Sequence, residues 1–274
     1  MRHDGGMAND NARLAILIDA DNTTARRAAD VMAEVARLGT ATVKRAYGDW
    51  TTTQLNGWKP ELLRHAIQPI QQYAYTTGKN STDSALIIDA MDLLYAGNLD
   101  GFVIVSSDSD FTRLATRLRE SGRSVYGIGR RNTPQPFQDA VEKFTFLEVI
   151  GSAAEEPADG AATEPTTAEV SAAPLPDLRK LLTEAIQSTT HDDSWAPLGT
   201  VGSNLNRNNP SFDPRNYGFN KLVDLAKTQN YVDVEQPKSG PARIRLRSAR
   251  PAKQTTSAKA PTRKAAAVKP PHSE

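Results

Sequence analysis

The chain has 274 residues and no cysteine, which excludes disulfides, thiolate chemistry and cysteine-based zinc sites and is typical of a reducing compartment. Its net charge of +1 is uninformative overall, and the only strongly basic stretch is the tail after Ser248. No apolar run approaches the roughly 20 residues of a membrane span, and the polar N-terminus does not have the pattern of a signal peptide. We therefore expect a cytoplasmic protein without membrane contacts.

The first half of the chain alternates predicted strands and helices. A short apolar strand over 14–19 is followed by the potential helix cap Asn22-Thr23-Thr24 and by a helical pattern over 25–38 that ends at Gly39. Further strands are predicted over 40–47, 68–75, 102–105, 124–128 and 144–149, and further helices from about Pro60, over 83–95 and over 111–120. This order predicts a mainly parallel sheet with right-handed crossovers and helices on both faces.

The composition changes at Gly151. Residues 151–176 are rich in Ala, Glu, Pro and Thr without periodicity, which predicts a disordered linker. In the second unit, over 177–248, helices are predicted from Leu178, over 201–205 and over 219–226, with strands over 231–234 and 243–247. Three helices and a hairpin predict a small winged-helix-like α+β domain. Residues 249–274 predict a basic disordered tail, which either adds salt-sensitive affinity for nucleic acid or only increases solubility.

Acidic residues follow two of the apolar strands. Asp19 ends the first strand, and Asp108 and Asp110 follow the strand over 102–105, while Asp83 lies in the first turn of the preceding helix. Because the carboxyl ends of parallel strands form one edge, we expect these acids to lie together. Such acids repel one another unless a cation is present, and hard oxygen ligands favour Mg²⁺ or Mn²⁺. A site of this kind suits hydrolysis of a phosphate ester.

Some of these residues also have a purely structural interpretation. Asn22 and Asp110 would each serve as a helix cap, and Asp83 would be stabilised by a helix dipole. Asp19 and Asp108 are harder to explain in this way, because each follows a wholly apolar strand. Further along the same helix as Asp83, we expect Asp89 and Asp92 to be solvated or paired.

Three motifs in order resemble the NYN domain, the LabA-like branch of the PIN-like nucleases, over residues 12–150. They are Ile18-Asp19-x-x-Asn22, Gly78-Lys79-x-x-x-Asp83 and Ser106-Ser107-Asp108-Ser109-Asp110-Phe111. The resemblance implies a PIN-like three-layer α/β/α fold and metal-dependent hydrolysis of RNA. Asp19, Asp83, Asp108 and Asp110 would be the metal-site acids, Asn22 a supporting polar group and Lys79 an RNA contact. Ser107 stands where the family often has Gly, and we expect this to alter the turn rather than the ligands.

A second motif, Ser211-Phe212-Asp213-Pro214-Arg215-Asn216-Tyr217-Gly218-Phe219, resembles the OST-HTH or LOTUS domain, over residues 177–247. The resemblance implies RNA binding or docking of protein partners. Arg215, Tyr217, Arg243 and Arg245 are the candidate RNA contacts. The aromatic residues of the motif also suit a core or a turn, and the arginines also suit a solvated strand edge.

Three functions remain open at this point. The first is a metal-dependent ribonuclease with a C-terminal RNA-binding module. The second is a non-catalytic adaptor for RNA or protein. The third rests on Asp19-Ala20-Asp21-Asn22-Thr23, which resembles the opening motif of haloacid-dehalogenase-type phosphatases and would make Asp19 a nucleophile and Asp21 a general acid. The sequence does not specify an RNA target, endo- or exonuclease action, the number of metals or an oligomeric state.

Overall fold

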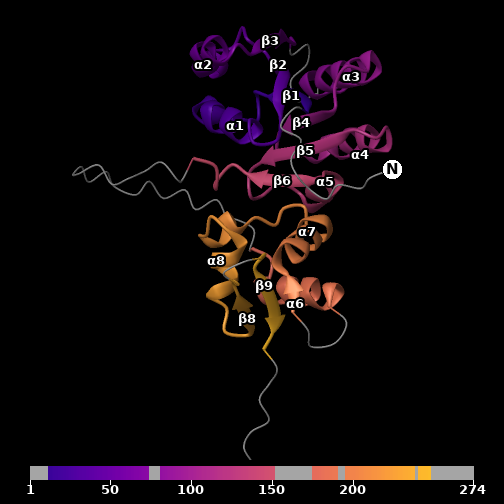
Figure 1. Cartoon of the computed structure of the whole chain (residues 1–274). Helices are drawn as coiled ribbons and strands as arrows, with labels where there is room; N and C mark the ends of the chain where they lie inside the picture. The colour runs from indigo at the N-terminus through magenta and orange to yellow at the C-terminus, as the bar shows by residue number, and fades with distance from the viewer. Residues whose placement is uncertain (1–11, 74–80, 152–174, 191–194, 238–239, 248–274) are drawn as a thin grey trace, which may run out of the picture.

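The computed structural model describes residues 12–73, 81–151, 175–190, 195–237 and 240–247. The first two ranges form an α/β domain, and the others form a smaller α+β domain (Figure 1). Most of the predicted linker over 151–176 and all of the predicted tail over 249–274 lie outside the described residues. Within the described residues, none of the helices combines the length and the apolar composition needed to cross a bilayer.

The larger domain is organised around a six-stranded sheet in the order β3-β2-β1-β4-β5-β6, and every neighbouring pair is parallel. The prediction of a mainly parallel sheet is therefore confirmed. The strands are β1 (Arg13–Asp19), β2 (Thr40–Gly48), β3 (Gln68–Gln71), β4 (Gly101–Val105), β5 (Ser124–Gly129) and β6 (Lys143–Phe146). The chain first builds outward from β1 to β3 and then fills the other side from β4 to β6, so the strand order reverses between β1 and β4.

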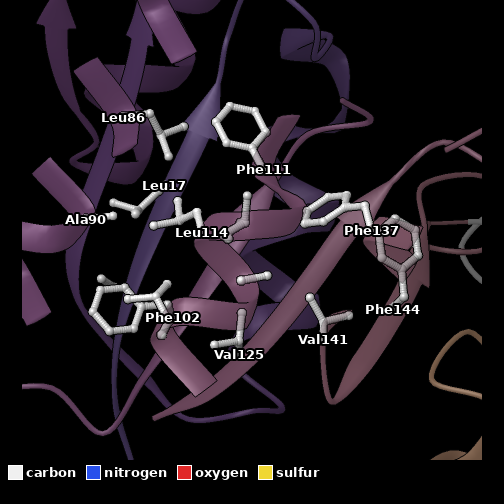
Figure 2. Packing of buried hydrophobic residues seen from close by; sticks show 14 of the residues in the cluster. Leu17, Leu86, Ala90, Phe102, Phe111, Leu114, Val125, Phe137, Val141 and Phe144 are labelled. Carbon is white, nitrogen blue, oxygen red and sulfur yellow. The ribbon is translucent and has the colours of Figure 1, made fainter. Parts of the chain in front are cut away.

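Helices cover both faces of this sheet, which gives the predicted three layers (Figure 1). Those on one face are α1 (Ala28–Val35) and α2 (Trp58–His65), and those on the other are α3 (Ser81–Ala96), α4 (Thr112–Glu120) and α5 (Gln135–Ala140). Alternate residues of β4 enter the two resulting cores: Ile104 packs on the α3 side and Val103 on the α1 side. Figure 2 shows the α3-side core, in which Phe111, Phe137 and Phe144 fill the space beside α4. Burial on both faces explains why β4 is apolar throughout.

The observed elements differ from the predicted ones in several places. The helix predicted over 25–38 begins as a 3₁₀ turn over Ala25–Arg27, has no side-chain cap at Thr24, and ends as α1 at Val35. The helix α5 was not predicted, because its six residues are too short to show helical periodicity. The strand predicted to reach residue 75 ends at Gln71, and residues 74 and 75 lie outside the described ranges.

The smaller domain contains the three predicted helices and the predicted pair of strands. The helices are α6 (Leu178–Thr189), α7 (Leu198–Asn208) and α8 (Leu222–Lys227), and the strands are β7 (Ala196–Pro197), β8 (Val232–Glu235) and β9 (Arg243–Leu246). The additional strand β7 pairs with β9, giving an antiparallel sheet in the order β7-β9-β8. This arrangement confirms a small α+β domain with its own core around Leu182, Val201 and Ile244.

The two domains meet along β6 and α1. The backbone N–H of Phe144 in β6 donates to the carbonyl oxygen of Pro210 over 2.8 Å, so the second domain covers part of the outer edge of the large sheet. Beside it, the Arg215 guanidinium donates to both carboxylate oxygens of Glu34 in α1, each over 2.8 Å. The same guanidinium donates to Asp213 over 2.7 Å. A buried ion cluster thus joins the two domains.

Candidate metal and nucleic-acid site

The candidate site lies at the carboxyl ends of β1 and β4, where the strand order reverses. Ile18 of β1 is the register partner of Val105 of β4, so Asp19 and Ser106 leave the sheet side by side. Helices depart from this point toward opposite faces, and the crevice between them is where open α/β sheets bind ligands.

Three carboxylates from two segments come together here. Asp83 in the first turn of α3 and Asp108 and Asp110 after β4 each offer an oxygen, and the three oxygens lie within 4.8 Å of one another. Asp108 also caps the 3₁₀ turn over Ser109–Phe111, since its Oδ1 accepts the N–H of Asp110 over 2.9 Å. The cap considered for Asp110 is therefore supplied by Asp108 instead.

Asp19 lies behind this group and is fully buried. Its Oδ2 accepts hydrogen bonds from Ser106 Oγ over 2.8 Å and from Asn22 Nδ2 over 2.9 Å. Ser106 Oγ in turn accepts the backbone N–H of Asp108 over 3.1 Å. Asp19 thus supports the turn that presents Asp108, and the side chain of Asn22 binds Asp19 rather than capping a helix. Ser106 was missed as a site residue, although it stands between the apolar strand and the acidic motif.

The acids destabilise one another's charged forms. Burial, followed by the negative charges of Asp19, Asp108, Asp110 and Asp21, raises the pKa of Asp83 to about 6. Burial also raises the pKa of Asp19, against the opposing effect of the hydrogen bonds from Asn22 and Ser106. A bound cation would offset this repulsion. The group consists of carboxylates alone, and such hard oxygen ligands fit Mg²⁺ or Mn²⁺.

Two further acids, Asp21 and Asp89, lie outside the three-carboxylate group and make structural contacts. Asp21 accepts a hydrogen bond from Thr82 Oγ1 over 2.8 Å and so ties the end of β1 to the start of α3. Asp89 binds Arg45 and the Tyr47 hydroxyl, which confirms that it is paired. The pKa of Tyr47 is raised by its burial and by Asp89.

A phosphatase nucleophile needs an exposed oxygen, so the burial of Asp19 and its two side-chain donors disfavour the phosphatase hypothesis.

A groove of about 260 Å³ adjoins Asp108. Its lining residues come from the ends of β1, β4 and β5 and are Asn22, Ser107, Asp108, Ser109, Arg130, Asn132 and Pro134. The Ser107 hydroxyl accepts the backbone N–H of Arg130 over 2.8 Å. The expected effect of Ser107 on the turn, compared with Gly, stays a prediction.

The residues predicted to contact RNA differ in how far their side chains are engaged in contacts within the protein. Lys79 lies outside the described residues. Arg215 binds Glu34 and Asp213, and the Tyr217 hydroxyl donates to the Pro176 carbonyl oxygen over 2.9 Å, so both residues have structural roles. Arg245 lies 4.6 Å over the Trp195 ring and bonds Asp233, whereas Arg243 is exposed at the start of β9.

Comparisons with solved structures give partial matches. A Vibrio parahaemolyticus protein of unknown function is 18% identical, with a TM-score of 0.44, over 52% of this chain and 96% of its own. A Chromobacterium violaceum protein is 39% identical, with a TM-score of 0.23, over 26% of this chain and 80% of its own. An uncharacterised Nitrosomonas europaea protein is 30% identical, with a TM-score of 0.24, over 34% of this chain and 95% of its own. A search of curated proteins finds no match.

Family models match both parts of the chain. The NYN domain model matches residues 13–148, and the OST-HTH/LOTUS domain model matches residues 173–243. The first match contains the whole six-stranded sheet and the three carboxylates, and the second contains most of the smaller domain. The chain therefore contains an NYN domain followed by an OST-HTH/LOTUS domain.

Proposed function

We propose that this protein is a metal-dependent ribonuclease that hydrolyses phosphodiester bonds at the Asp83, Asp108 and Asp110 group. The observation that carries the proposal is the convergence of these three carboxylates, with their mutual repulsion, at the reversal point of an NYN-domain sheet. A divalent cation bound there would supply positive charge for the phosphate oxygens and activate the attacking water.

The roles of the side chains follow from their positions. Asp83, Asp108 and Asp110 would hold the cation, because their oxygens share one small volume. Asp19, Asn22 and Ser106 would keep the Asp108 turn in place through the hydrogen bonds described above. Such support matters because a displacement of about 1 Å at a catalytic group can lower a rate by roughly 100-fold.

The second domain supports RNA as the substrate. Its family match suggests RNA binding, and the exposed Arg243 on β9 is a candidate contact. The described contacts of Arg215 and Tyr217 are internal, and Arg245 bonds Asp233 and lies over the Trp195 ring, so we propose Arg243 as the first of these residues to test for RNA binding.

The test is incubation of the full chain with labelled single-stranded RNA and Mg²⁺ or Mn²⁺, with and without a chelator. Asp108→Asn and Asp110→Asn should each lower kcat by at least about 100-fold, since each removes a charged ligand. Asp92→Asn is a matched control, because Asp92 is an exposed acid on the same helix as Asp83 and lies outside the three-carboxylate group. It should retain full activity.

Two results would contradict the proposal. Metal-dependent binding of RNA without cleavage would favour the adaptor function. Cleavage that survives in Asp108→Asn at the wild-type rate would place the activity elsewhere or in a contaminant.

A further inference from the structure

The groove beside Asp108 differs chemically from the acidic group that it adjoins. Apart from Asp108 and Pro134, its lining consists of neutral polar side chains and one cation, Arg130. Among the residues that the structure describes, none with an aromatic side chain lines it, and these residues therefore offer a base nothing to stack on. Hydroxyl, amide and guanidinium donors beside a cation-binding site are suited to phosphate and sugar oxygens.

Arg130 is well placed to contribute charge. It is exposed, and within the described part of the chain its guanidinium makes no hydrogen bond or salt bridge to another residue, while its backbone N–H and carbonyl oxygen are both hydrogen-bonded. The Arg130 carbonyl oxygen accepts the N–H of Thr133 over 3.0 Å and the Thr133 hydroxyl over 2.6 Å. The backbone of Arg130 is held beside the groove, and its guanidinium, which has no partner among the described residues, is free to pair with an anion there.

Ser107 connects the backbone of Arg130 to the turn that carries Asp108. Its Oγ accepts the Arg130 N–H, and its neighbour Asp108 belongs to the three-carboxylate group. One hydroxyl therefore links the loop after β5 to the turn after β4. The hydroxyl proton of Ser107 is left to donate to an oxygen in the groove.

We propose that the Ser107–Arg130 groove binds the phosphate next to the scissile phosphate of an RNA strand, with Arg130 as the positioning residue. This inference rests on the proposed ribonuclease function for the location of the scissile phosphate. Because the contacts go to the backbone, the groove aligns the strand without selecting a sequence.

The experiment has a binding arm and a kinetic arm, both on the full chain. In the binding arm, fluorescence anisotropy with chelator present measures the affinity for two short RNAs of unrelated sequence across a range of salt concentrations. Arg130→Gln should raise Kd about tenfold for both RNAs and reduce the slope of log affinity against log salt by about 0.7, which is one single-strand phosphate contact. Arg130→Lys should preserve most of the slope, because it keeps the charge.

In the kinetic arm, Arg130→Gln should raise KM by about tenfold while kcat stays within about twofold, since the contact aligns the substrate before the chemical step. Ser107→Ala should have a smaller effect of the same kind. The matched control is Arg64→Gln: Arg64 is an exposed arginine that contacts Glu61 and lies beside the amino end of β2, remote from the site.

The outcomes separate this inference from the proposed function. Wild-type cleavage with unchanged KM, Kd and salt slope in Arg130→Gln would overturn the groove assignment alone. A changed salt slope without any cleavage by the wild type would support the groove as a phosphate site and overturn the ribonuclease. An equal change in Arg64→Gln would also overturn the assignment, because the effect would then reflect general charge.

Discussion

The ion cluster between the domains provides the sharpest stability prediction. Glu34 is 3% exposed, and Arg215, whose side chain is 18% exposed, bonds both of its oxygens and also Asp213. Replacing Arg215 by Met keeps most of the side-chain volume but leaves two carboxylates without their main partner. Removing one partner of a buried ion pair costs about 3–5 kcal/mol.

The expected value lies at the lower end of that range. Arg37 and Lys143 remain 3.2 and 3.6 Å from Glu34 and partly compensate its charge. We therefore expect Arg215→Met to destabilise the contact between the domains by about 3 kcal/mol. Because each domain has its own core, the loss should appear as a separation of one unfolding transition into two.

Differential scanning calorimetry and urea unfolding at pH 7 measure this effect. The control Arg64→Met removes a pair that is exposed on the arginine side and should cost less than about 1 kcal/mol. A double-mutant cycle with Glu34→Gln should then return a coupling energy of about 1–3 kcal/mol. The reasoning is refuted if Arg215→Met unfolds like the Arg64→Met control, with a single transition and the same loss.

The pH dependence of the same variant has a definite sign. Burial by itself would raise the pKa of Glu34, but Arg215, Lys143 and Arg37 more than compensate and lower it from 4.5. Burial of Asp213 is likewise outweighed by Arg215, which lowers its pKa from 3.8. Carboxyl groups with lowered pKa values stabilise the folded state above their ordinary pKa and lose this effect as the pH falls through the lowered value. The difference between wild type and Arg215→Met should therefore persist at pH 7 and narrow below about pH 4.

Two further predictions concern the acidic site. Ser106→Ala removes a hydrogen-bond donor from buried Asp19 and should lower the free energy of unfolding, measured with urea at pH 8, by about 1–3 kcal/mol. At acidic pH, where Asp19 is protonated, the decrease should be smaller. A decrease that does not depend on pH would contradict this role of Ser106. The pKa of Asp83 is about 6 in the folded protein and 3.8 as its ordinary value, so the metal-free wild type loses stability as the pH rises from 3.8 to 6. Asp83→Asn should therefore be about 1 kcal/mol more stable than the wild type at pH 7 and no more stable below about pH 4. Mn²⁺ should stabilise the wild type but not Asp83→Asn, and Asp92→Asn should behave like the wild type in both measurements.

Much of the fold was predictable because its signals are local. The apolar run of β4 is followed directly by Asp108 and Asp110, and the alternation of strands and helices requires parallel pairing. The motif around Asp83 placed a third acid at the start of α3, where the structure has it. Strand burial and helix starts depend on neighbouring residues, and each leaves a pattern in a few consecutive positions. The short helix α5 left too few residues for such a pattern.

The tertiary structure decided which side chains meet. It separated Asp19, buried and held by Ser106 and Asn22, from the three carboxylates that share one small volume. It also gave Arg215 a partner in Glu34, 181 positions away in the chain. Neither the Asp19–Ser106 pair nor the Arg215–Glu34 pair has a local signature, because the first depends on strand register and the second on the docking of one domain against the other. The acids of the candidate site were therefore evident in the sequence, whereas their spatial grouping and burial required the assembled fold.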